Sequence, residues 1–241
     1  MTVLLLSALI VLVASALHAA TGFGFSILAV PLLLMIHEPL VAVQVNLILS
    51  IGLSLLLVPT VTRDIDTTLL WRLVASSVLG IPLGVLMLLH LDIALFKVLI
   101  AVLTLVFTAL LLLQLRFQRS PGRDWLSGLL AGGFTAALGM GGVPLLLYFA
   151  GTQMPKAVVR GTVLAFFLFI YTLALGAQVA VTSSRSDIWW LSSALVPVAL
   201  VGVWVGDWLF QRITQRTFRG AIYAVLVGNS AVLLWSAWRV A

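Results

Sequence analysis

The sequence predicts an all-α integral membrane protein made of two inverted repeats, each with one re-entrant, V-shaped broken helix and three transmembrane helices. Its 241 residues are 63% hydrophobic and 8% charged, a composition typical of chains embedded in a bilayer. A glycine-rich break interrupts an apolar segment twice, at Thr21-Gly-Phe-Gly-Phe25 and at Leu138-Gly-Met-Gly-Gly142. The distribution of arginine and lysine indicates how these broken segments enter the membrane.

The chain is internally duplicated. The two breaks begin 117 residues apart (139 minus 22). Further matching landmarks are Pro39 with Pro155 at 116 residues, and Gly80 and Gly84 with Gly202 and Gly206 at 122 residues. Two copies of an apolar module that each open with an interrupted helix are typical of transporters whose substrate site lies at the repeat interface. We therefore expect a first repeat at residues 1–118 and a second at 119–241.

The first repeat is predicted to open with the re-entrant segment at residues 3–36. Three apolar stretches follow, each close to the roughly 20 residues that a helix needs to cross the hydrocarbon core. We expect these helices at 39–59, 68–89 and 93–115. Asp66 and Asp92 lie just before two of them and carry the acceptor side chain of an N-cap.

The second repeat is predicted to open with a re-entrant segment at 125–150. The glycines from 139 to 142 divide it into arms of about 14 and about 8 residues, each too short to cross the membrane alone. Three helices are expected at 161–182, 188–210 and 221–238. The glycine pairs of helices 68–89 and 188–210 have the small-xxx-small spacing that allows close helix packing.

The basic residues favour the re-entrant arrangement. If both broken segments crossed the membrane, seven Lys and Arg would face one side and six the other. If both segments return to the side from which they enter, ten face one side and the remaining three are Lys97, Arg185 and Arg239. An excess of Lys and Arg marks the cytoplasmic side, so both termini are expected to be non-cytoplasmic. Three crossings per repeat then invert the second repeat, and the two glycine tips meet near the midplane.

Composition and spacing exclude several classes of function. The chain has no cysteine, and its three histidines, His18, His37 and His90, are scattered, so we expect no disulfide, no metal site and no cofactor. The stretch from Gly22 to Ser26 does not have the spacing of a nucleophile elbow, and no acidic residue stands near it, so we expect no enzyme. No nucleic-acid-binding motif occurs, and the net charge of +6 is interpreted as orientation and lipid contact.

The glycine breaks are each followed by a proline, in Gly22-Phe-Gly-Phe…Pro31 and in Gly139-Met-Gly-Gly-Val-Pro144. Two further stretches correspond between the repeats, Glu38-Pro-Leu-Val-Ala-Val43 and Met154-Pro-Lys-Ala-Val-Val-Arg-Gly-Thr162. On these motifs, and over essentially the whole chain, the sequence resembles the sulfite exporter TauE/SafE family, also named the toluene sulfonate uptake permease family. The resemblance implies an inverted-repeat carrier for sulfur-containing or carboxylate anions in a bacterial inner membrane.

The two breaks form the predicted substrate site. A helix that starts within the membrane presents unsatisfied N–H groups and about half a positive charge, which suit an anion. Glycine also lets the backbone approach an oxyanion closely. We therefore assign the anion cradle to Gly22, Gly24, Gly139, Gly141 and Gly142. The alternative role for these glycines is tight helix packing alone.

Polar side chains near the breaks complete the candidate site. Thr21 flanks the first break, and Gln44 and Asn46 lie just inside the helix that follows it. Arg160 and Thr162 occupy the equivalent places in the second repeat. Buried amides and hydroxyls need hydrogen-bond partners, and a guanidinium pairs well with oxyanions, although Arg160 is equally suited to anchor its helix at the lipid headgroups.

These observations predict a secondary transporter that moves a small sulfur-containing anion, such as sulfite or a sulfonate, by alternating access. Its expected partners are that anion and the lipid of a bacterial inner membrane. His18 is the candidate proton relay if transport is proton-coupled, and otherwise a structural histidine. The alternatives are a transporter of a small carboxylate and a non-transporting structural subunit of a membrane complex. The choice of anion, the direction, the coupling ion and the oligomeric state stay open.

Overall fold

The computed structural model describes residues 2–21, 24–113, 118–152, 154–182 and 185–210, and this part of the chain is helical with no strand. In chain order the helices are α1 (Thr2–Thr21), α2 (Phe25–Leu33), α3 (Pro39–Leu57), α4 (Thr67–His90), α5 (Ile93–Leu113), α6 (Pro121–Leu138), α7 (Gly142–Gly151), α8 (Lys156–Thr182) and α9 (Ser186–Phe210). Two short 3-10 turns, Val58–Thr60 and Thr62–Asp64, join α3 to α4.

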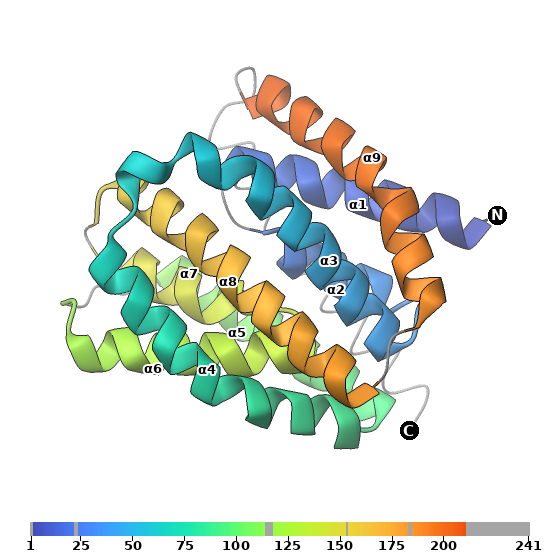
Figure 1. Ribbon diagram of the computed structural model, residues 1–241, viewed down its shortest axis with the longest axis horizontal. Coiled ribbons are helices and arrows are strands. Elements are labelled where there is room, and N and C mark those ends of the chain that lie inside the picture. The colour runs from blue at the N-terminus through green and yellow to red at the C-terminus, as the bar shows by residue number, and fades with distance from the viewer. Residues whose placement is uncertain (1, 22–23, 114–117, 153, 183–184, 211–241) are drawn as a thin grey trace.

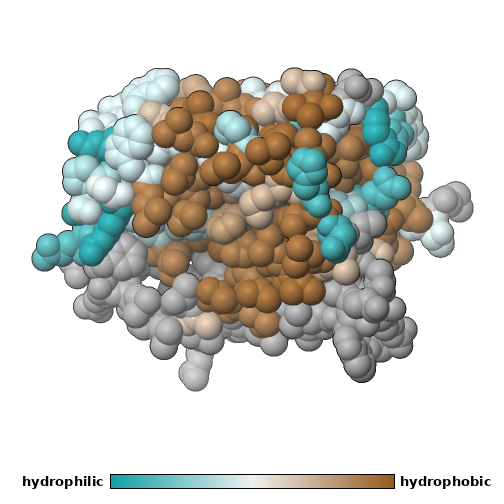
Figure 2. Space-filling view, turned by 90° about the horizontal axis from the view of Figure 1, so that it is seen from below, coloured by the Kyte–Doolittle hydropathy of each residue, from teal (hydrophilic) through white to brown (hydrophobic). Residues whose placement is uncertain are grey.

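Five of the described helices have the length and apolar composition to cross a membrane, namely α1, α3, α4, α8 and α9. Their outward faces carry large apolar side chains, including Leu79 at 62% exposure and Trp204 at 73%. Figure 2 shows hydrophobic side chains across the middle of one face, with hydrophilic ones mainly toward its two ends. Such a surface fits lipid and not water, so the chain is a multi-pass membrane protein.

The structure confirms two predicted helix starts and moves a third. Asp66 accepts a hydrogen bond from the backbone N–H of Leu69 at 2.9 Å, and Asp92 accepts one from Leu95 at 2.7 Å, which confirms both predicted N-caps. Helix α8 begins at Lys156 and not at residue 161. The helix expected at 221–238 lies outside the described residues.

Helix α6 is longer than expected. It begins at Pro121 and has 18 residues, against the arm of about 14 that its hydrophobicity suggests. Ser120 caps it by accepting a hydrogen bond from the N–H of Arg123, and proline occupies the first position, where a missing N–H costs nothing. The polar first turn extends the helix beyond its apolar part.

Helices α1 and α2, and helices α6 and α7, form two helical hairpins. In the first hairpin, Ser7 near the start of α1 shares a 2.9 Å hydrogen bond with His37, which follows α2. In the second, the hydroxyl of Tyr148 on α7 donates to the carboxylate of Asp124 at the start of α6. The short second arm therefore folds back along the long first arm in both hairpins.

The long helices pack in a reciprocal pattern (Figure 1). Helix α4 packs most extensively on α6, and α9 packs on α1, so each hairpin is held by a helix from the other half of the chain. A Cβ atom added to Gly84 would lie 2.2 Å from the carbonyl oxygen of Gly133, and one added to Gly206 would lie 2.2 Å from that of Ala16. This confirms the close-packing role predicted for these glycines.

Helices α3 and α8 pack against each other in opposite directions through the middle of the molecule. Gln44 near the start of α3 donates to the hydroxyl of Thr182 at the end of α8, at 3.4 Å. At the other end, Gly161 near the start of α8 packs against the backbone of Asp64, beyond the end of α3. These two helices carry the side chains that reach the second break.

We predict that Gly84→Ala lowers the melting temperature of the purified protein, because its new methyl group forces α4 away from α6 at a cost of about 1–3 kcal/mol. Gly52→Ala on α3 is the matched control, since nothing lies within 4 Å of its added Cβ. The control is expected to gain up to about 1 kcal/mol by restricting the unfolded chain. Equal melting temperatures for the two variants would contradict the close α4–α6 contact.

Candidate functional site

The second break is a buried helix end with a defined hydrogen-bonded cap. Gly139 ends α6 with a φ of +68°, a left-handed conformation that favours glycine. Its N–H bonds to the carbonyl oxygen of Thr135 at 2.9 Å, and the N–H of Met140 bonds to that of Phe134 at 3.1 Å. The first of these bonds is that of an αL C-cap, and the two together satisfy two of the terminal carbonyls of α6.

Two fully buried amide side chains bind further carbonyls at the end of α6. The Nδ2 of Asn46 on α3 donates to the carbonyl oxygen of Gly139 at 3.0 Å. The Nε2 of Gln178 on α8 donates to that of Ala136 at 2.8 Å. Asn46 is a predicted site residue, whereas the sequence analysis missed Gln178. The available signal was an amide in the middle of an apolar helix, which requires a polar partner.

The first break leads into α2, whose N-terminal residue follows Gly24. That glycine has a φ of 104°, again in the range that favours glycine. Ser26 on α2 shares a 3.1 Å hydrogen bond with the hydroxyl of Tyr171 on α8. Gly22 lies outside the described residues, and Thr21 is the last residue of α1.

His18 lies in the last turn of α1 and is 3% exposed. Its ring meets the ring of Phe25 edge-on, with 6.4 Å between centroids. Neither ring nitrogen has a hydrogen-bond partner among the described residues. Arg160, which is exposed in the second turn of α8, is near enough for its charge to act on the His18 ring.

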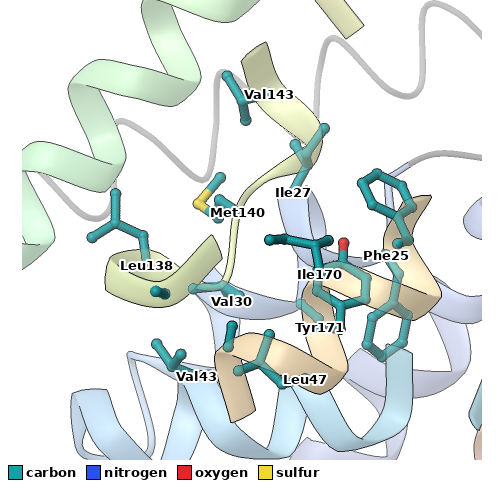
Figure 3. Close-up of a cluster of buried hydrophobic side chains, with 14 of the residues drawn as sticks. Phe25, Ile27, Val30, Val43, Leu47, Leu138, Met140, Val143, Ile170 and Tyr171 are labelled. Carbon is teal, nitrogen blue, oxygen red and sulfur yellow. The ribbon is translucent and has the colours of Figure 1, made fainter. Parts of the chain in front are cut away.

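The two hairpins meet at the second break. A Cβ added to Gly139 would lie 3.3 Å from Val30 of α2 and 3.5 Å from Val43 of α3. Figure 3 shows the apolar side chains gathered around this junction, among them Met140, which is fully buried. Apolar side chains from α2, α3, α7 and α8 therefore pack around the tip of the second hairpin.

Two of the predicted cradle glycines, Gly141 and Gly142, pack closely against other residues. A Cβ added to Gly141 would lie 1.8 Å from the hydroxyl of Thr135 and 2.7 Å from the carbonyl oxygen of Ala131, both on α6. A Cβ added to Gly142 would lie 3.2 Å from the ring of Phe167. A large residue at position 141 would open the hairpin itself, so its effect on transport does not test contact with an anion.

The remaining predicted residues lie away from the second break. Gln44 bonds to Thr182, as described, toward the end of the molecule where α8 finishes. The hydroxyl of Thr162 accepts a hydrogen bond from the backbone N–H of Asp66 at 2.9 Å and so ties α8 to the start of α4. Sequence equivalence between the repeats did not place these side chains together with Asn46.

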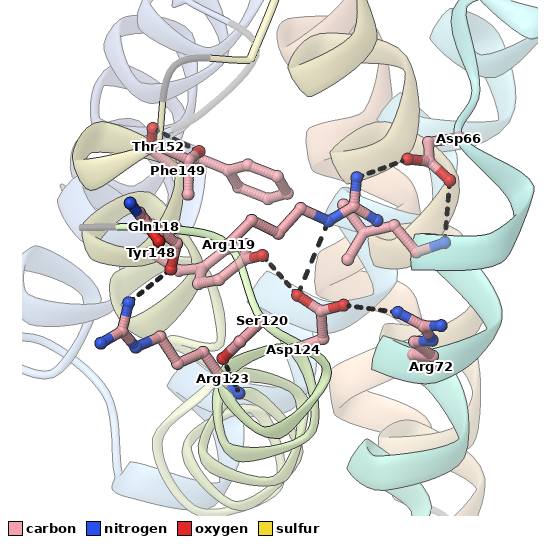
Figure 4. A network of polar contacts seen from close by, with 11 residues as sticks. Asp66, Arg72, Gln118, Arg119, Ser120, Arg123, Asp124, Tyr148, Phe149 and Thr152 are labelled. Atoms are coloured by element: carbon pink, nitrogen blue, oxygen red, sulfur yellow. Dashed lines mark hydrogen bonds and ion pairs between the residues drawn. The ribbon is translucent and has the colours of Figure 1, made fainter. Parts of the chain in front are cut away.

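A charged network that the sequence analysis did not identify joins α4, α6 and α7 at one end of the molecule (Figure 4). At its centre is Asp124, which has no exposed side-chain surface. It pairs with Arg72 at 3.2 Å and with Arg119 at 3.8 Å, and it accepts the hydroxyl proton of Tyr148. Arg119 also binds Asp66 at 2.9 Å. The network fixes the open end of the second hairpin to α4.

Asp66 belongs to this network at its solvent-facing edge. Burial by itself raises the pKa of Asp66, but the N–H of Leu69 and the guanidinium of Arg119 outweigh burial and hold that pKa below its usual value. Its carboxylate therefore contributes stability above a pH of about 4, and that contribution is lost as the pH falls through the lowered pKa. The opposite end of the molecule has a smaller cluster, in which Arg185 pairs with Glu38 and Asp187.

We predict that Arg72→Gln combined with Arg119→Gln destabilises the protein by about 3 kcal/mol or more, because it leaves the buried Asp124 carboxylate without a cation. Adding Asp124→Asn removes that charge and is expected to recover part of the loss. The measurement is thermal unfolding in detergent. A triple variant less stable than the double variant would show that Asp124 does not depend on these two arginines.

The comparisons with known proteins support the membrane character of the chain. Neither a curated protein nor a solved structure gives a significant match. The family model described as sulfite exporter TauE/SafE matches residues 7–233, nearly the whole chain, in agreement with the resemblance inferred from the glycine motifs. The chain therefore belongs to the sulfite exporter TauE/SafE family of membrane transporters.

Proposed function

We propose that this protein is a secondary transporter that carries a small sulfur-containing oxyanion, such as sulfite or a sulfonate, across a bacterial inner membrane by alternating access. The observation that carries the proposal is the meeting of two glycine-broken hairpins from opposite halves of the chain, at Val30 and Gly139. A broken helix in a membrane is tolerated where it lines a site for a polar substrate. Membership of a transporter family agrees with this use of the breaks.

The packing supports inverted repeats. Helices α3 and α8 are equivalent by the sequence duplication, lie in contact and run in opposite directions. An axis that exchanges two adjacent antiparallel membrane-crossing helices is perpendicular to them and therefore lies in the membrane plane. The exchange of partners, α4 on α6 and α9 on α1, follows the same two-fold relation.

The charges support an orientation. Arg72, Arg119 and Arg123 lie at the end of the molecule where α4 and α6 begin, and by the positive-inside rule this end is cytoplasmic. The bond between Ser7 and His37 returns the first hairpin to the opposite side, near Glu38 and Arg185. In this arrangement α1 enters from outside and does not complete a crossing, although its length would suffice.

The anion is expected to bind at the first break. The N-terminus of α2 offers free N–H groups and a partial positive charge. His18 adds two buried nitrogens without a partner among the described residues, and Arg160 adds a full positive charge nearby. Buried apolar side chains pack around the second break (Figure 3), so we expect transport to require the hairpins to move against α3 and α8.

We predict saturable uptake of radiolabelled sulfite into proteoliposomes that contain the purified protein. Unlabelled sulfoacetate is expected to compete, and a short carboxylate such as acetate is expected to compete less. Stronger inhibition of labelled-sulfite uptake by the carboxylate than by sulfoacetate would instead favour the carboxylate carrier. An absence of flux for any of these anions, from folded protein, would contradict the proposal and favour a structural subunit.

His18→Leu is expected to reduce sulfite uptake by roughly tenfold or more, because a hydrogen bond to a charged group contributes about 1.5–3 kcal/mol. His90→Gln is the matched control, since this histidine is exposed at the end of α4. Uptake is to be compared at equal amounts of correctly folded protein in the vesicles. Equal uptake by the two variants would remove His18 from the anion site.

A further inference from the structure

The second break contains a helix C-terminus as well as a helix N-terminus. Here the C-terminus of α6, and not only the N-terminus of α7, meets the centre of the molecule, and a helix C-terminus carries a partial negative charge on its last carbonyls. The amides of Asn46 and Gln178 each use their NH₂ group on one of these carbonyls. Their own oxygens, Oδ1 and Oε1, are buried and have no hydrogen-bond partner among the described residues.

These two oxygens are held close to the same helix end. An amide oxygen and nitrogen share one carbon and are separated by only about 2.2 Å, so each free oxygen lies beside the carbonyl that its nitrogen binds. The two carbonyls belong to Ala136 and Gly139, one helical turn apart on α6. Two buried acceptors without donors therefore stand next to a negative helix end, an arrangement that costs free energy unless a positive group enters it.

Serines on α3 extend the same set of acceptors. Ser50 and Ser54 follow Asn46 at intervals of four residues, so the three side chains share one face of the helix. Both hydroxyls are buried and have no hydrogen-bond partner among the described residues. Other buried serines of the described chain have a partner, as Ser15 and Ser192 do at 2.6 and 2.8 Å with the carbonyl four residues earlier. Ser50 and Ser54 therefore leave unpartnered oxygen on the face of α3 from which Asn46 reaches the second break.

We propose that the second break binds a small monovalent cation of the sodium type, held by Asn46 Oδ1, Gln178 Oε1, the hydroxyl of Ser50 and the terminal carbonyls of α6. Hard cations prefer oxygen ligands of this kind. All the oxygens are neutral, and Asp124 lies twelve residues before Ala136 on α6, about 18 Å along the helix. A site without a carboxylate suits a single positive charge better than a divalent ion.

The cation site has a consequence for transport, and that consequence alone rests on the proposed function. The cation at the second break would offset the charge of an anion at the first break, since the two hairpins touch at Val30 and Gly139. Binding of each ion would then favour binding of the other, by the reciprocity of linked equilibria. Cation binding itself requires no substrate and can be measured alone.

The test is a thermal-stability titration of the full-length protein in detergent, at constant pH and ionic strength, with sodium replacing choline. Lithium and potassium form separate arms that report selectivity. A ligand that binds only the folded state raises the melting temperature in a saturable manner. We expect a saturable rise with sodium and a smaller one with potassium. The same melting temperature in sodium, potassium and choline would overturn the proposal. It would leave the result of the anion-flux experiment, and the proposed transport function, unaffected.

Variants of the amides separate cation binding from a structural role. Gln178→Leu removes the free oxygen. It is expected to raise the sodium concentration at the midpoint of the titration by roughly tenfold or more. Gln178→Glu loses the same NH₂ donor but adds charge at the oxygen, so it is expected to shift the sodium midpoint to lower concentration. Gln44→Leu is the control, because that amide binds the hydroxyl of Thr182 and not a carbonyl of α6. If the sodium concentration at the midpoint were as high for Gln178→Glu as for Gln178→Leu, the effect would come from the lost NH₂ donor alone. That result would overturn the assignment.

Discussion

A helix that ends inside a membrane leaves backbone groups that no water can reach, and the structure is organised around satisfying them. At the second break this is done by the backbone N–H bonds of Gly139 and Met140 and by amides from α3 and α8. Those amides require α3 and α8 to lie beside the break, and the glycines of α4 allow that helix to hold α6 in place. The central position of α3 and α8 follows from this requirement.

The open ends of the two hairpins are held by different contacts. The open end of the second hairpin has a buried carboxylate with two arginines and a tyrosine, whereas in the described part of the chain the open end of the first hairpin has the bond between Ser7 and His37. A buried charge network is costly to break, so the second hairpin is anchored more firmly than the first. In an alternating-access cycle, we therefore expect the first hairpin to move more readily against the central pair of helices.

The fold was predictable from the sequence where hydrophobicity and capping residues agree. Asp66 and Asp92 marked helix starts correctly, and the small-xxx-small glycines marked close contacts. The start of α6 was missed because its first turn is polar, although Ser120 followed by proline is a recognisable cap, and the start of α8 was missed because Lys156 and Arg160 interrupt its apolar residues. The candidate site was predictable only in part. Gln178 and Asp124 act through partners 42 and 52 residues away in sequence, and spacing within one segment does not reveal such contacts.

The central claim is that the two halves of the chain have opposite orientations in the membrane, and cysteine labelling from each side tests it most directly. The chain has no cysteine, so Thr62→Cys between α3 and α4, and Ser186→Cys at the start of α9, each introduce a single exposed thiol at equivalent positions of the two halves. Inverted repeats predict that a membrane-impermeant maleimide labels Ser186→Cys in intact cells and labels Thr62→Cys only after the membrane is permeabilised. Labelling of both thiols from the same side would contradict inverted repeats and the alternating-access account built on them.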